Sequence, residues 1–111
     1  MNYEVWHKDM LAKGYQNFFL GDLAKGSIAL FAECFKNIAN NINSGPEILL
    51  DEAHELKGHA MKYCLKKLLV PIEELEESIN ANDVEGIKKQ IKAMVVIIKE
   101  YKAMVVEHCD D

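Results

Sequence analysis

The 111-residue sequence is poor in the residues that interrupt helices. It has two prolines and six glycines, and long stretches contain neither. Because proline and glycine are the strongest breakers of helical structure, their scarcity favours a helical chain. Half of the residues are apolar and 28% are charged, which is ordinary for a folded chain and unlike a disordered one. The length predicts one domain, residues 1–111, with a single core.

Other absences limit the function. No run of about 18 uninterrupted apolar residues occurs, so we expect no membrane span. The net charge of −5 argues against general affinity for nucleic acid, and the opening MNYEVWHKDM does not have the pattern of a secretory signal. Cys34, Cys64 and Cys109 are widely spaced without a C-x-x-C pair, which argues against a disulfide framework or a zinc site. We therefore expect reduced cysteines in a cytoplasmic protein.

Two stretches have apolar residues at alternating spacings of three and four, the pattern of an amphipathic helix. The C-terminal one predicts a helix of about 24 residues, with its apolar stripe at Val84, Ile87, Ile91, Met94, Ile98, Tyr101 and Val105. Asn82, three positions before Glu85, resembles the start of a capping box. The earlier stretch predicts a helix that begins near Asp22, with its stripe at Ile28, Phe31, Phe35, Ile38 and Ile42.

The breaks between helices predict the topology. The segment NSGP at 43–46 ends one helix, and Pro46 suits the first turn of the next. An unbroken helix from 46 to 81 would be about 54 Å long, too long for a compact domain, so we expect the chain to reverse between Met61 and Pro71.

The first twenty residues are less regular and predict a short helix with a lead-in that caps the core, through Trp6, Met10, Tyr15, Phe18 and Phe19. We therefore expect an all-α fold, an antiparallel four-helix bundle with a short N-terminal capping helix.

The stretch LLDEAHELKGHAMK, residues 49–62, has an unusual solvent face. At roughly 100° per residue, the buried stripe of this helix consists of Leu49, Ala53, Leu56, Ala60 and Tyr63. His54 lies about 160° from Leu56, nearly opposite the core. The same side carries Leu50, Asp51, Lys57, Gly58, Met61 and Lys62.

These neighbours suit a histidine that carries a phosphoryl group. Gly58, one turn after His54, costs about 1 kcal/mol of helix propensity but removes a side chain that would crowd the ring. Lys57 places an ammonium near any anion attached to the imidazole. Leu50 and Met61 offer an apolar patch for a partner, and we assign the docking rim to Leu50, Asp51, Met61 and Lys62.

The same residues resemble the signature of the histidine-containing phosphotransfer (HPt) domain family, an alanine-histidine pair followed by a leucine or isoleucine, a lysine and a glycine. Here the signature consists of Ala53, His54, Leu56, Lys57 and Gly58. The similarity continues in register at Leu68, Leu75 and Glu76, and it covers residues 46–108. The chain departs from the family pattern after the signature, at His59, Ala60 and Pro71, and at Cys64, where a glycine is usual.

The resemblance implies a four-helix bundle in a two-component phosphorelay. His54 would accept a phosphoryl group through Nε2 from the aspartate of a response-regulator receiver domain and pass it to another receiver. Lys57 would help to neutralise the phosphate, and Gly58 would leave room for the partner. A sensor histidine kinase is expected upstream. The chain would have no cofactor of its own, with Mg²⁺ on the receiver, and it would be a phosphoryl carrier rather than an enzyme.

Three other interpretations of the sequence compete with this one. The letters DEAH at 51–54 match a helicase box, but a helicase needs a P-loop, and no G-x-x-x-x-G-K-[ST] occurs. A di-iron bundle needs inward-facing Glu-x-x-His pairs, whereas only Asp51 and His54 have similar spacing and His54 faces outward. His7, His59 and His108 do not share that face, so we expect no metal site. The remaining alternative is a non-catalytic helical module that binds a receiver domain without carrying phosphate.

Overall fold

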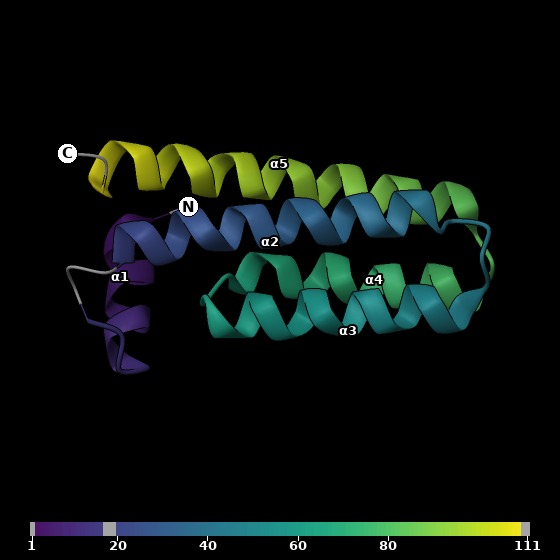
Figure 1. Cartoon of the computed structure of the whole chain (residues 1–111), viewed down its shortest axis with the longest axis horizontal. Helices are drawn as coiled ribbons and strands as arrows, with labels where there is room; N and C mark the ends of the chain where they lie inside the picture. Colours follow the sequence, from purple (N-terminus) through teal and green to yellow (C-terminus); the bar gives the residue numbers. More distant parts are fainter. Residues whose placement is uncertain (1, 17–19, 110–111) are drawn as a thin grey trace.

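The computed structural model describes residues 2–16 and 20–109, and every regular element in those ranges is helical (Figure 1). The prediction of an all-α chain is therefore confirmed. The elements are α1 (Tyr3–Ala12), α2 (Leu20–Asn40), α3 (Pro46–Lys62), the 3₁₀ helix η2 (Lys66–Leu68), α4 (Leu69–Asn80) and α5 (Val84–Cys109). Phe18 and Phe19, which the sequence assigns to the N-terminal cap, lie outside the described residues.

The helices α2, α3, α4 and α5 lie side by side along the 42 Å axis of the molecule, and each reverses the direction of the one before (Figure 1). Helix α2 packs against α3 and α5, and α4 packs against the same two helices. Helix α1 lies across one end of the others and contacts α5. The chain reverses between α3 and α4, which confirms the predicted turn between Met61 and Pro71.

The predicted apolar stripes form the core. In α2, Phe31, Phe35 and Ile38 are buried as expected. In α5, the buried part of the predicted stripe consists of Ile87, Met94, Ile98, Tyr101 and Val105. Apolar periodicity therefore predicted correctly which side of each long helix faces the interior.

Helices α1, α3 and α4 end in the same way, with a left-handed residue two positions after the last helical residue. These residues are Gly14 (φ 96°), Cys64 (φ 57°) and Asn82 (φ 53°). After α3, the N–H of Leu65 donates to the carbonyl of Ala60 at 2.8 Å, and the other two ends have equivalent bonds. This is the Schellman motif, which satisfies carbonyls that have no partner inside the helix.

The start of α5 differs from the predicted capping box. The carboxylate Oδ1 of Asp83 accepts a hydrogen bond from the N–H of Gly86 at 3.0 Å, so Asp83 caps the helix in place of Asn82. The reason is that Asn82 is in the left-handed conformation that closes α4. An N-cap residue normally has extended backbone angles, so the cap moves one residue along the chain.

Candidate functional site

Helix α3 places His54 on its solvent side, as the periodicity predicts. The opposite side carries four side chains that are at most 3% exposed: Leu49, Ala53, Leu56 and Ala60. His54 itself is exposed, and within the described residues its imidazole has no hydrogen bond, ion pair or ring contact. No intramolecular partner among the described residues therefore occupies the ring nitrogens.

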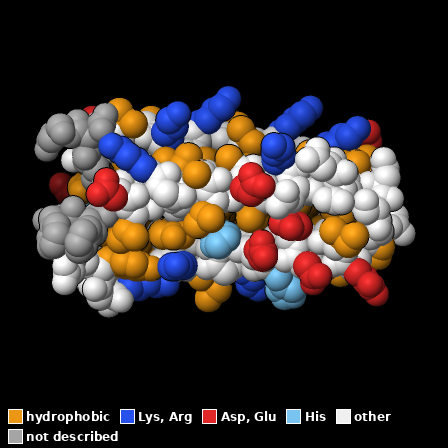
Figure 2. Space-filling model, in the orientation of Figure 1, with side chains coloured by type: hydrophobic (Ala, Val, Ile, Leu, Met, Phe, Trp, Pro, Cys, Tyr) orange, Lys and Arg blue, Asp and Glu red, His pale blue; other side chains and the backbone are white. Residues whose placement is uncertain are grey.

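The predicted neighbours of His54 share this side of α3. Gly58, Asp51 and Lys62 are exposed, and Met61 is 55% exposed. Lys57 is half-buried and forms no ion pair with any residue in the described ranges. Figure 2 shows histidine and acidic side chains gathered over the part of the molecule where α3 lies. The structure therefore brings the predicted acceptor, the cation and part of the docking rim to one accessible surface.

Gly58 is a glycine that the fold does not require. A Cβ atom built on Gly58 would meet no heavy atom within 4 Å, and its φ angle is not in the left-handed region. At Gly86, by contrast, a Cβ would lie 2.5 Å from Oδ2 of the capping Asp83. Since an exposed mid-helix glycine costs about 1 kcal/mol relative to alanine, its presence beside His54 has no explanation in local packing.

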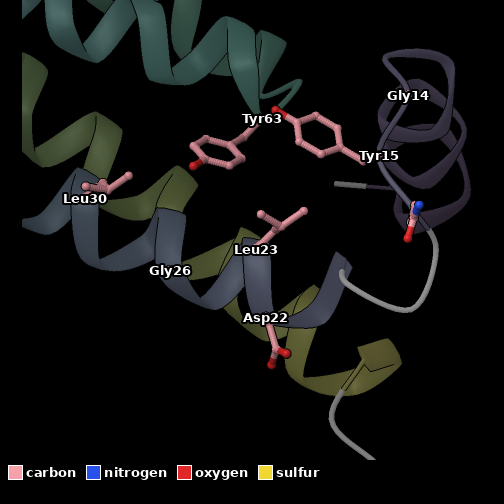
Figure 3. A pocket seen from close by; sticks show the side chains of 8 residues that line it. Gly14, Tyr15, Asp22, Leu23, Gly26, Leu30 and Tyr63 are labelled. Atoms are coloured by element: carbon pink, nitrogen blue, oxygen red, sulfur yellow. The ribbon is translucent and has the colours of Figure 1, made fainter.

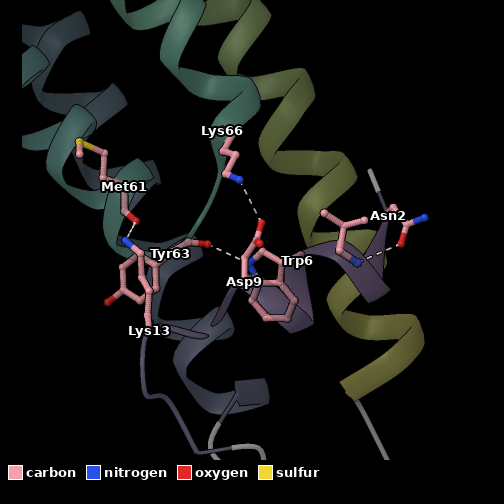
Figure 4. Close-up of polar contacts among 8 residues, drawn as sticks. Asn2, Trp6, Asp9, Lys13, Met61, Tyr63 and Lys66 are labelled. Carbon is pink, nitrogen blue, oxygen red and sulfur yellow. Dashed lines mark hydrogen bonds and ion pairs between the residues drawn. The ribbon is translucent and has the colours of Figure 1, made fainter. Parts of the chain in front are cut away.

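The N-terminal segment holds the end of α3 in place (Figure 4). The side chains of Lys13, Tyr15 and Trp6 donate hydrogen bonds to three successive carbonyls, those of Met61, Lys62 and Tyr63. The bond from Trp6 Nε1 is 2.8 Å long and buried. Because the last carbonyls of a helix lack partners within it, these donors fix the turn that carries Met61 and Lys62. Sequence patterns do not reveal this role, since the bonds join residues far apart in the chain.

A second group of polar side chains lies between α3 and α2. Cys34 of α2 is 4% exposed, and potential ligand atoms of Cys34, Glu55 and His59 all lie within 4.8 Å of one another. The pKa of the Cys34 thiol is raised to about 11 by burial and by the charges of Glu52, Glu55 and Glu33. The expectation of no metal site rests on the wide spacing of the cysteines and on the lack of paired Glu-x-x-His motifs, and neither pattern reveals a grouping of side chains from two helices.

A cavity of about 590 Å³ lies between α2, the segment after α1 and the end of α3 (Figure 3). Its walls include the rings of Tyr15 and Tyr63 and the side chains of Leu23 and Leu30. No predicted site residue lines it. His54 therefore lies on the open surface of α3, away from this cavity.

Comparisons of the chain with protein-family models, with curated proteins and with solved structures gave no match. Among the described residues, no helix is both long enough and apolar enough to cross a membrane.

Proposed function

We propose that this chain is a histidine phosphotransfer protein of a two-component phosphorelay, folded as an antiparallel four-helix bundle with α1 as its cap. The observation that carries the proposal is an exposed His54 beside Gly58, a glycine that the packing does not need. An exposed imidazole next to a residue without a side chain suits a histidine that must enter the active site of another protein. The proposed partners are a response-regulator receiver domain and a sensor histidine kinase, in the cytoplasm.

The proposed reaction is a transfer between two proteins. Nε2 of neutral His54 attacks the phosphorus of an aspartyl phosphate on the receiver, forming an N–P bond while the bond to the aspartate oxygen breaks. The receiver regains a free carboxylate, and His54 carries the phosphoryl group until a second receiver reverses the step. Such transfer depends mainly on position and on charge neutralisation. Mg²⁺ belongs to the receiver, so this chain needs no nucleotide site or metal for the reaction.

Each neighbour of His54 has a part in this proposal. Lys57 lies one turn from His54 and has no carboxylate partner among the described residues, so its ammonium is available to the bound phosphate. The absent side chain at Gly58 leaves space for the receiver. Met61 and Leu50 supply apolar contact area, and Lys62 a cation for docking to an acidic receiver cleft. The donors from the N-terminal segment hold Met61 and Lys62 in register with His54.

Incubation with a phosphorylated receiver domain tests the proposal. We expect one phosphoryl group per chain, stable in base and labile in acid, located at His54 by mass spectrometry. His54→Gln should abolish uptake, because glutamine has no comparable nucleophile. The matched control is His108→Gln, the same substitution at another exposed helical histidine, which should take up label as the wild type does.

Two outcomes would contradict the proposal. Uptake of label by a folded His54→Gln variant would show that another residue is the acceptor. Binding of the receiver without any transfer of label to the wild-type chain would support the alternative, a helical module that only binds receivers.

A further inference from the structure

The side of α3 that faces α2 carries a stripe of potential metal ligands. Glu52, Glu55 and His59 are three or four residues apart, so they lie on one side of the helix. This stripe is centred roughly 130° from His54 around the helix axis. Across from it, α2 presents Phe31 and Cys34. The rings of Phe31 and His59 meet edge to face with their centroids 6.1 Å apart.

Three donor atoms converge at this place. A sulfur from Cys34, a carboxylate oxygen from Glu55 and a ring nitrogen from His59 all lie within 4.8 Å of one another. The donor atoms of a tetrahedral zinc site, with bonds of 2.0 to 2.3 Å, lie about 3.3 to 3.6 Å apart. Small side-chain rotations therefore suffice to close the three donors on one ion. The spacing of Glu55 and His59 is the i, i+4 spacing by which helices place two ligands on a single metal.

Several carboxylates lie near Cys34. Burial raises the pKa of the Cys34 thiol, and the nearby charges of Glu52, Glu55 and Glu33 raise it further. The Oε2 atom of Glu52 is buried and accepts no hydrogen bond within the described part of the chain. A buried carboxylate oxygen without a partner is costly. A divalent cation beside it would offset that cost and would also favour the thiolate form of Cys34.

We propose that Cys34, Glu55 and His59 form a binding site for Zn²⁺ that joins α2 to α3, with Glu52 as the neighbouring charge that helps to balance the ion. Binding converts the Cys34 thiol to a zinc-bound thiolate and releases one proton to solvent. Sulfur and imidazole ligands favour Zn²⁺ over Mg²⁺ and Ca²⁺, which prefer sites made of oxygen alone. None of the three ligands belongs to the proposed phosphoryl-accepting surface.

Cobalt substitution in the full-length, metal-free chain tests the site. Co²⁺ should bind once per chain and give a thiolate-to-cobalt charge-transfer band together with the visible bands of a tetrahedral ion. Zn²⁺ should displace it with the same stoichiometry, whereas Mg²⁺ and Ca²⁺ should not. Cys34→Ser should remove the charge-transfer band. Glu55→Gln and His59→Gln should each weaken zinc binding by more than about 100-fold. Glu52→Gln should weaken it by about 10-fold, an effect typical of a residue just outside the metal ligands.

Cys64→Ser is the matched control, because Cys64 lies after α3 and outside the group of ligands. Its cobalt spectrum should equal that of the wild type, and so should that of His54→Gln. Far-ultraviolet circular dichroism will show that each variant is folded. A wild-type spectrum without a charge-transfer band would overturn the proposal, as would a band that survives Cys34→Ser or displacement of Co²⁺ by Mg²⁺.

Discussion

Two histidines five residues apart on α3 lie in contrasting surroundings. His54 projects into solvent beside a glycine and, within the described residues, makes no hydrogen bond, ion pair or ring contact. His59 is half-buried, packs against the ring of Phe31 and lies close to Cys34 and Glu55. One helix therefore presents an exposed imidazole to solvent and a group of potential ligand atoms to its neighbour. The difference shows that the surroundings of each histidine depend on whether solvent or a neighbouring helix lies opposite it.

The largest expected effect tests whether the outer side of α3 must stay uncrowded. Gly58→Leu should slow phosphoryl uptake from a receiver by about 100-fold, because displacing the reacting groups by an ångström has an effect of that size. The helix should remain intact, since a Cβ at Gly58 meets nothing within 4 Å. The initial rate of label transfer is the measurement.

The control for this substitution is Ala93→Leu, which places the same leucine side chain at an exposed position of α5, a helix that packs against α2 and α4. Its transfer rate should be that of the wild type. Equal rates in Gly58→Leu and the wild type would mean that no partner approaches His54 over Gly58.

The second prediction concerns the inner side of α3, in protein kept free of metal with a chelator. Burial and then the charges of Glu52, Glu55 and Glu33 raise the pKa of Cys34 from 9.0 to about 11. The unfolded chain therefore loses this proton near pH 9 while the folded chain keeps it to about pH 11. Below pH 9 the protonated thiol contributes fully to the free energy of unfolding. As the pH rises from 9 to 11, the free energy of unfolding falls by about 2 to 3 kcal/mol.

Urea unfolding at a series of pH values measures this fall, with Cys34→Ala as the reference, since other titrating groups contribute equally to both proteins. The wild type should lose stability relative to the variant between pH 9 and pH 11. Parallel curves over that range would show that the thiol titrates normally in the folded protein.

The contrast between the two sides of α3 also explains what sequence reasoning found and missed. The outer surface was predictable because Leu56, His54 and Gly58 belong to one helix, whose period places each of them. Cys34 and His59 belong to different helices, and their approach depends on how α2 and α3 align along their lengths. No local pattern encodes that alignment. The hydrogen bond from Trp6 to the Tyr63 carbonyl was missed for the same reason.

The third prediction separates stability from function on the outer side. Gly58→Ala should raise the free energy of unfolding by about 1 kcal/mol, because alanine is the better helix former and its Cβ has free space. Gly26→Ala in α2 is the matched control, since it is equally open to a Cβ and should give the same gain. Thermal or urea unfolding measures both variants. A loss of stability at Gly58 alone would mean that the glycine has a structural role, and it would weaken the case for a functional one.

The smallest expected effect concerns Cys64, two positions after the last residue of α3. Its φ of 57° is left-handed, a conformation that costs a non-glycine residue roughly 1 to 2 kcal/mol. Cys64→Gly should remove this cost but lose the contact that the half-buried side chain makes with the core, leaving a net gain of about 0.5 kcal/mol.

Asn82→Gly, at the equivalent position after α4, should change the stability less than Cys64→Gly does, because asparagine tolerates this conformation better than other non-glycine residues. Urea unfolding of both variants measures the difference. A loss of stability in Cys64→Gly would show that the side-chain contact outweighs the backbone strain. Packing of the Cys64 side chain would then stabilise the turn after α3 more than a glycine could by relieving the backbone strain.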